Sequence, residues 1–306
     1  MMQPIKTVGV IGVGAMGVLY ADQFTRALGP EHVLVLADAK RVERYRREGI
    51  YLNEERCSFQ YADAASVAGP VDLLLFAVKF SGLEDAVETC RHLVGPDTIL
   101  LSVLNGIRSE QVLSDAFGAE KVVWCVAQKM SAQKQGNRAT CHQPGELAVG
   151  VPAGQDTARL RRLTDFFDSI GFTYTLPADI RLHKWGKLLC NTGCNQAAMV
   201  YSCGYAELQT PGPARDAMIA AMREVVLVAN AEGVPLTEQD VTDWVQVIDD
   251  FAPEGAPSMR QDGMAHRKSE VELFAGTIRR LGAAHGVPTP VNDWLYQRVQ
   301  EIESQY

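Results

Sequence analysis

A glycine-rich segment near the start of the chain restricts its fold more than any other feature. The residues Gly12-Val13-Gly14-Ala15-Met16-Gly17 follow the apolar run 8–11 and open a segment of helical character. In a strand, turn and helix unit of this kind, the first glycine permits a tight turn and the second lets backbone amides approach a pyrophosphate. The third lets helix and strand pack closely, and the anion rests at the helix N-terminus. We therefore predict that residues 12–17 bind the phosphates of a dinucleotide.

The rest of the first half alternates short apolar runs with helical segments. Helices are expected from Ala15, from Lys40, over 83–93 and over 157–169, and strands over 8–11, 33–37, 71–78, 98–104 and 122–126. Such alternation predicts a mostly parallel sheet with helices on both faces.

After Pro177 the pattern changes to helical periods without a convincing strand. The helices are expected over 182–201, 214–231, 237–251, 270–285 and 291–303, with glycine and proline between them. We predict a Rossmann-type α/β dinucleotide-binding domain of residues 1–178 and an all-helical substrate or catalytic domain of residues 179–306.

Three polar residues form a stripe on the first of these helices. Lys187, Asn191 and Asn195 are four residues apart, so they share one helical face over about 12 Å. Asparagine forms helix poorly, and a solvated face more often carries Glu, Gln and Lys. The stripe therefore indicates a lining for something polar, although a surface face that happens to hold asparagine remains the competing interpretation.

The composition argues against several classes of protein. The 306 residues are 47% hydrophobic and 22% charged, which is typical of globular proteins. A net charge of −8 argues against a nucleic-acid surface, and no apolar run approaches the roughly 18 residues that cross a membrane. The seven cysteines form neither a Cys-x-x-Cys pair nor a cluster at metal spacing. We expect no metal, no membrane segment, no signal peptide and reduced thiols in the cytoplasm.

The end of the second expected strand bears on the choice between the two nicotinamide dinucleotides. Asp38 lies 26 residues after Gly12, where a carboxylate binds an unphosphorylated ribose and repels a 2′-phosphate. Lys40 and Arg41 follow at once and supply cations for a 2′-phosphate. The residues leave NADH and NADPH both open.

Nearly the whole chain resembles the ketopantoate reductase (2-dehydropantoate 2-reductase) family. Beyond the glycine-rich turn, the motifs occur in that family's order: Ala77-Val78-Lys79, Leu104-Asn105-Gly106, Trp185-x-Lys187-x-x-x-Asn191-x-x-x-Asn195, Pro257-Ser258-Met259-x-x-Asp262 followed by Glu270, and Pro288-Thr289-Pro290-Val291-Asn292.

The resemblance implies NADPH-dependent reduction of ketopantoate to pantoate, on the route to pantothenate and coenzyme A, in a cleft between the two domains. It makes Lys187 the catalytic lysine and Glu270 its acidic partner. It assigns the other positions as follows: Asn105 to the nicotinamide and substrate, Lys79 to the cofactor side, Asn191 and Asn195 to the polar groups of the substrate, and Ser258 to its carboxylate.

Several positions depart from the family's pattern. Asp38 stands where members often have arginine, so NAD is a possible cofactor beside NADP. Tyr205 replaces an asparagine of a frequent Asn-Gly-Glu-Leu segment, and Ala275 replaces another asparagine. The alternatives are therefore a reductase of a different branched 2-oxo acid, or a non-catalytic dinucleotide-binding sensor. The resemblance permits both monomers and homodimers, and the apolar helix 214–231 fits either a core or a dimer surface.

Overall fold

The computed structural model describes residues 3–306, and the chain divides into two compact units. The first unit runs to Leu104 and resumes over Arg108–Ile180, whereas the second comprises Asn105–Ile107 and Arg181–Tyr306. The sequence predicts a single boundary after residue 178. In the structure the chain passes into the second unit after Ile180, and the loop 105–107 also belongs to that unit.

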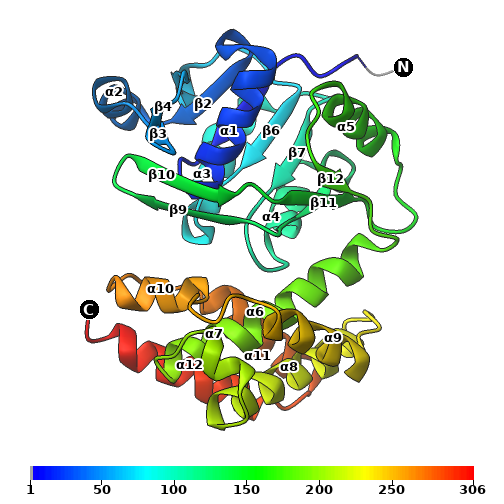
Figure 1. The fold of residues 1–306 in the computed structure, drawn as a ribbon. Helices are drawn as coiled ribbons and strands as arrows, with labels where there is room; N and C mark the ends of the chain where they lie inside the picture. Colours follow the sequence, from blue (N-terminus) through cyan, green and yellow to red (C-terminus); the bar gives the residue numbers. More distant parts are fainter. Residues whose placement is uncertain (1–2) are drawn as a thin grey trace. The chain divides into compact units, whose positions relative to one another are not determined.

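A five-stranded parallel sheet forms the centre of the first unit (Figure 1). Its order is β5 (Gln60–Asp63), β2 (Val33–Ala37), β1 (Val8–Ile11), β6 (Leu73–Phe76) and β7 (Ile99–Ser102). The helices of this unit are α1 (Ala15–Leu28), α2 (Ala39–Glu48), α3 (Leu83–Cys90), α4 (Ser109–Phe117) and α5 (Ala158–Ser169). Short 3₁₀ turns lie between them at Pro30–His32, Ala64–Ser66, Phe80–Gly82, Arg91–Leu93 and Ala119–Lys121.

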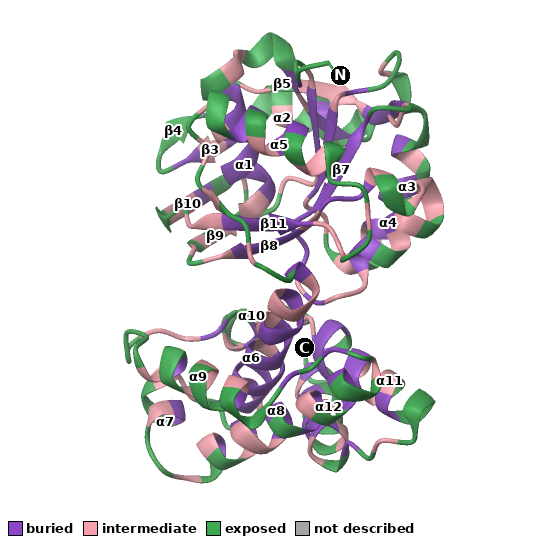
Figure 2. Ribbon diagram, turned by 90° about the vertical axis from the view of Figure 1, so that its right-hand side faces the viewer, coloured by how far each residue is buried: buried purple, intermediate pink, exposed green. Residues whose placement is uncertain are grey.

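Alternate residues of the sheet point to two separate hydrophobic cores. Val10 and Leu75 pack in one core with residues of α1 and α5, while Ile11 and Leu74 pack in the other with residues of α3 and α4. Because both faces are covered, the central strands are buried throughout, as Figure 2 shows. The expected parallel sheet with helices on both faces is confirmed.

Two further sheets in the first unit, each with parallel and antiparallel pairs, were not expected from the sequence. The sheets consist of β12 (Tyr174–Thr175), β11 (Glu146–Gly150) and β8 (Trp124–Gln128), and of β4 (Glu55–Arg56), β3 (Tyr51–Leu52), β10 (Arg138–Gln143) and β9 (Ser131–Gln135). The strand expected over 122–126 is displaced to Trp124–Gln128, because Val122 forms only an isolated parallel bridge with Leu100 before the strand begins. β9 and β10 were missed because they are largely polar and partly exposed, which weakens the hydrophobic alternation.

The described residues of the second unit contain helices and no strand. These helices are α6 (Ile180–Val200), α7 (Tyr205–Gln209), α8 (Pro213–Ala231), α9 (Glu238–Asp249), α10 (Ser258–Met264), α11 (Thr277–His285) and α12 (Pro290–Glu303). The expectation of one helix over 270–285 is wrong at its start: a π-helical turn spans Glu272–Gly276, and α11 follows it. The Gly276 amide bonds the carbonyl of Val271, five residues earlier, so one extra residue enters this turn.

None of the helices among residues 3–306 is both long and apolar enough to cross a bilayer.

Candidate cofactor and substrate sites

The fold itself requires two of the three glycines in the turn before α1. Gly12 has a φ of +101°, and a Cβ there would lie 2.5 Å from the Ala77 carbonyl. A Cβ at Gly17 would lie 1.9 Å from the Gly12 carbonyl oxygen. Both positions are therefore closed to any side chain by neighbouring backbone.

Gly14 differs, because the protein leaves room for a side chain at this position. Its φ is −74°, and the nearest atom to an added Cβ is the Ala77 oxygen at 3.8 Å. Gly14 is the N-cap of α1, whose first turn contains no acidic residue. An open space at a helix N-terminus fits a pyrophosphate, which needs close backbone approach and no competing negative charge.

Asp38 caps α2 and binds one of the two basic residues beside it. Its Oδ1 accepts from the Arg41 amide at 2.8 Å, and its Oδ2 lies 3.3 Å from Arg41 Nε. Asp38, Lys40 and Arg41 are all exposed at the end of β2, which is the ribose end of this fold. Lys79 is also exposed, at the end of β6.

Two residues of the polar stripe on α6, Asn191 and Asn195, are joined by a hydrogen bond within the second unit. Lys187 and Asn191 are half-buried, and Asn195 is 5% exposed. Asn195 Nδ2 donates to Asn191 Oδ1 at 3.3 Å. Asn195 Oδ1 accepts from Ser258 Oγ at 2.9 Å and from the Met259 amide at 3.1 Å. The structure thus brings Asn191, Asn195 and Ser258 together, and Asn195 holds the start of α10.

A second pair of expected site residues meets from positions far apart in the sequence. Asn105 Nδ2 donates to Glu270 Oε2 at 2.8 Å, although 165 residues separate them. The next residue, Gly106, has a φ of +81°, and its added Cβ would lie 3.4 Å from the Leu273 carbonyl oxygen in the π-helical turn. The loop with Asn105 therefore packs directly on the turn that follows Glu270.

The face of α6 beside the stripe carries buried thiols. Burial raises the pKa of Cys190 to about 12. The nearby Lys187 cation acts in the opposite direction, but its effect is smaller. Burial also raises the pKa of Tyr205, whose hydroxyl lies near Cys194 and Cys190. Its ring contacts Phe251 edge-on, with ring centroids 4.9 Å apart. The sequence marks Tyr205 only as a departure from a motif, because no pattern indicates that its side chain lies near the thiols of α6.

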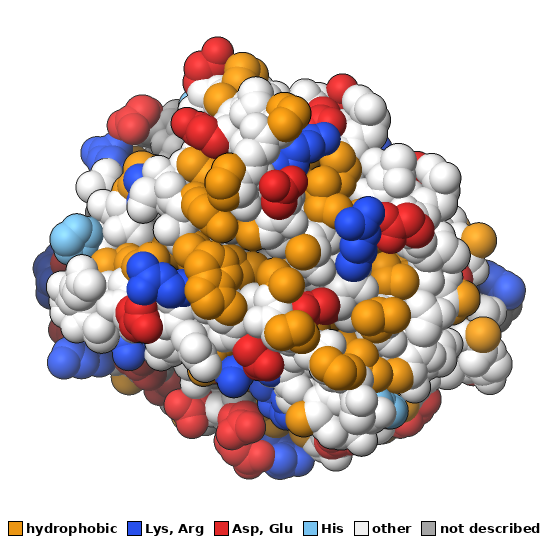
Figure 3. All heavy atoms as spheres, turned by 90° about the horizontal axis from the view of Figure 1, so that it is seen from below, with side chains coloured by type: hydrophobic (Ala, Val, Ile, Leu, Met, Phe, Trp, Pro, Cys, Tyr) orange, Lys and Arg blue, Asp and Glu red, His pale blue; other side chains and the backbone are white. Residues whose placement is uncertain are grey.

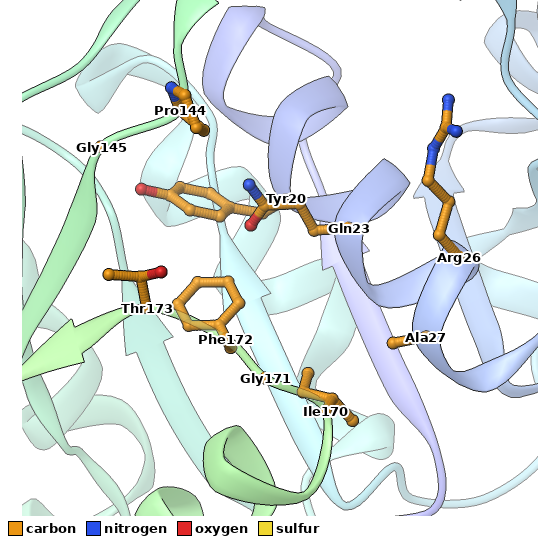
Figure 4. Close-up of a pocket in the computed structure, with 10 residues that line it drawn as sticks. All are labelled: Tyr20, Gln23, Arg26, Ala27, Pro144, Gly145, Ile170, Gly171, Phe172 and Thr173. Carbon is orange, nitrogen blue, oxygen red and sulfur yellow. The ribbon is translucent and has the colours of Figure 1, made fainter.

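Two hollows lie apart from the expected site residues. A pocket of about 390 Å³ on the first unit is lined by α1, the Pro144-Gly145 turn and residues 170–173 (Figure 4). A shallow apolar groove on the second unit is lined by Tyr201, Pro213, Trp294 and neighbouring residues of α8 and α12. Figure 3, which views the protein from below, shows hydrophobic side chains exposed among polar ones on this face of the second unit. One side of α8 is core, while Leu227 on the same helix is 56% exposed.

Comparisons with known proteins match both halves of the chain. Residues 8–154 match the family model described as Ketopantoate reductase PanE/ApbA, and residues 179–303 match its C-terminal model. The 2-dehydropantoate 2-reductase of Vibrio cholerae is 26% identical over 77% of this chain and 79% of the relative. That of Aquifex aeolicus is 25% identical over 96% of each.

Solved structures agree with this assignment. A PanE/ApbA family ketopantoate reductase from Ralstonia eutropha has a TM-score of 0.84 and 26% identity, covering 98% of this chain and 99% of that one. A D-mandelate dehydrogenase with NADH and anilino(oxo)acetate has a TM-score of 0.87 and 24% identity, covering 98% of each chain, and so shows the shared fold.

Together with the glycine turn, the family and relative matches define an NAD(P)-dependent oxidoreductase. Within that class, the chain belongs to the ketopantoate reductase family.

Proposed function

We propose that the protein reduces 2-dehydropantoate (ketopantoate) to pantoate, on the route to pantothenate and coenzyme A in the cytoplasm. The observation that carries the proposal is the assembly of Asn191, Asn195 and Ser258 in the unit that also holds Lys187 and the Glu270–Asn105 pair. Curated relatives over most of the chain are 2-dehydropantoate 2-reductases, which supports this substrate. All seven cysteines are free, which suits a reducing compartment.

The proposed chemistry needs a cation where charge develops. When bound, the reduced nicotinamide supplies the hydride that converts the ketone carbon to an alcohol carbon. The ammonium of Lys187 stabilises the negative charge on the former carbonyl oxygen and donates the proton that completes the hydroxyl. Glu270 orients that ammonium or accepts from the new hydroxyl, and Asn105 fixes the carboxylate through Oε2.

We further propose NADPH as the preferred cofactor. Residues 12–17 would hold its phosphates, and Lys79 would lie on the cofactor side of the site. The Asp38 carboxylate is already engaged by the Arg41 amide and Nε, which offsets its repulsion of a 2′-phosphate. The terminal nitrogens of Arg41, together with Lys40, are the cations that we assign to that phosphate. NADH remains the alternative because Asp38 is present.

Tyr205 favours a second candidate, reduction of a different branched 2-oxo acid. The Tyr205 ring contacts Phe251 edge-on and its hydroxyl lies near the thiols of α6, so we infer that it adds apolar surface near the stripe. Ketopantoate carries a hydroxyl that gains nothing from such a surface, whereas 2-oxoisovalerate has the same branched type of chain without that hydroxyl.

The test is a steady-state assay at 340 nm with ketopantoate and 2-oxoisovalerate, each with NADPH and NADH. We expect rapid oxidation with ketopantoate, a higher kcat/KM than with 2-oxoisovalerate, and a preference for NADPH. A higher kcat/KM for 2-oxoisovalerate would replace the substrate. Cofactor binding without oxidation by either acid would favour a different 2-oxo acid first and a non-catalytic sensor second.

A further inference from the structure

The residue before Glu270 is held by a carboxylate from the last turn of the C-terminal helix. Glu303 Oε1 accepts from the Ser269 amide at 2.7 Å and from Ser269 Oγ at 2.5 Å. Glu303 is 8% exposed, and 34 residues separate it from Ser269. No sequence motif connects these two positions.

The contact occurs where an exposed segment enters a packed one. Residues 264–268 are exposed, whereas Val271 and Leu273 are buried. Glu270 lies between them in a bend, and its carbonyl accepts from the Leu273 amide at 2.9 Å. Ser269 is therefore the first anchored residue of this junction, and the direction of the Glu270 backbone depends on where Ser269 is held.

Stability alone is a poor explanation for Glu303. Among the described residues, this buried carboxylate forms no ion pair, and both of its hydrogen bonds go to uncharged donors of one residue. Burying a carboxylate without a cation costs free energy, and an apolar residue at such a position is often at least as stabilising. What the carboxylate does provide is a defined position for the Ser269 amide.

We propose that Glu303 is a positioning residue for Glu270. It fixes the backbone on one side of Glu270, while Asn105 fixes the Glu270 side chain from another. The inference rests on the proposed function, because it assumes that Glu270 takes part in reduction. Small displacements of a catalytic group lower turnover strongly, so the contact acts on kcat rather than on cofactor binding.

The main test is a double-mutant cycle that combines Glu303→Ala with Glu270→Gln. We expect E303A to lower kcat by about 10- to 100-fold, with the cofactor Kd unchanged. E303Q keeps an Oε1 that accepts both bonds and should stay within about 3-fold of the parent protein. In the E270Q background, E303A should add less than about 3-fold, because residues that act as one unit are not additive. An equal loss in both backgrounds, or full activity of E303A, would overturn the proposal.

Two further measurements separate this proposal from the proposed function. Ser269→Ala removes only the hydroxyl bond and serves as the milder variant if E303A does not fold; its loss of kcat should also vanish in the E270Q background. Hydrogen exchange at the Ser269 amide should be slow in the parent and E303Q and faster in E303A. Full activity of E270Q would refute the role of Glu270 in reduction. The contact between Glu303 and Ser269 would then have no catalytic role, although it could still exist. Equal exchange rates at the Ser269 amide in all three proteins would show that Glu303 does not hold this amide.

Discussion

The first unit forms its candidate site from backbone, whereas the second forms its site from side chains. At the cofactor turn, Gly12 and Gly17 are required by carbonyl groups at 2.5 and 1.9 Å from an added Cβ, and Gly14 leaves the space open. In the second unit, Asn105 binds Glu270 across 165 positions, and Asn195 binds Ser258 across 63. A backbone site fails when a side chain is added, and a side-chain site fails when a hydrogen bond is removed.

The largest expected effect is a contrast between two glycines of the same turn. Gly17→Ala must displace the Gly12 carbonyl, so we expect a loss of about 3 kcal/mol in the free energy of unfolding and loss of cofactor binding. Gly14→Ala should change that free energy by less than about 1 kcal/mol, since a Cβ fits there. It should still weaken cofactor binding at least about 10-fold, because the methyl group occupies the approach of the pyrophosphate. Denaturation and cofactor titration measure both; unchanged affinity in G14A would remove the phosphates from this turn.

An intermediate effect is expected from one asparagine in the second unit. Asn105→Ala leaves Glu270 Oε2 without its donor, and kcat should fall about 10-fold. The control is Asn137→Ala in the first unit, which removes hydrogen bonds to the carbonyls of Glu48 and Gly49. Steady-state kinetics should show no change in kcat for the control. Equal losses in both variants would mean that the Asn105 contact has no special link to turnover.

A smaller effect is expected at the ribose end of the first unit. Asp38→Ser keeps an N-cap oxygen but removes the charge, so the ratio of kcat/KM for NADPH to that for NADH should rise several-fold while stability stays unchanged. Asp38→Ala removes the charge and the cap, so it should raise the same ratio and also cost about 1 kcal/mol of stability. An unchanged ratio in both variants would place the choice of cofactor on Lys40 and Arg41 alone.

The difference between a backbone site in the first unit and a side-chain site in the second also explains how far the sequence could predict the structure. The glycine turn and the parallel sheet were predictable because their signals are local: fixed spacing, and apolar runs that both faces bury. The long helices of the second unit were also predictable from period and punctuation, whereas the short helices α7 and α10 and the π-helical turn were not. The polar strands β9 and β10 were not, because their half-exposed residues carry little hydrophobic pattern.

Long-range contacts in the second unit lay beyond any pattern in the sequence. The stripe on α6 predicted that Asn191 and Asn195 share a face, but nothing indicated that Asn195 would hold Ser258 and the Met259 amide. Asn105 and Glu270 were named separately through a family resemblance, and only the fold joins them. Glu303 carried no signal at all, because helical periodicity cannot show which distant residue a buried carboxylate binds.

The most direct test of the account measures cofactor affinity and turnover on one variant, Lys187→Ala. We propose that the backbone of the first unit binds the cofactor and that side chains of the second carry out the reduction. K187A should therefore bind NADPH with an unchanged Kd while kcat with ketopantoate falls by about 10²- to 10⁴-fold. Unaltered turnover, or a loss of turnover fully explained by weaker cofactor binding, would contradict that division.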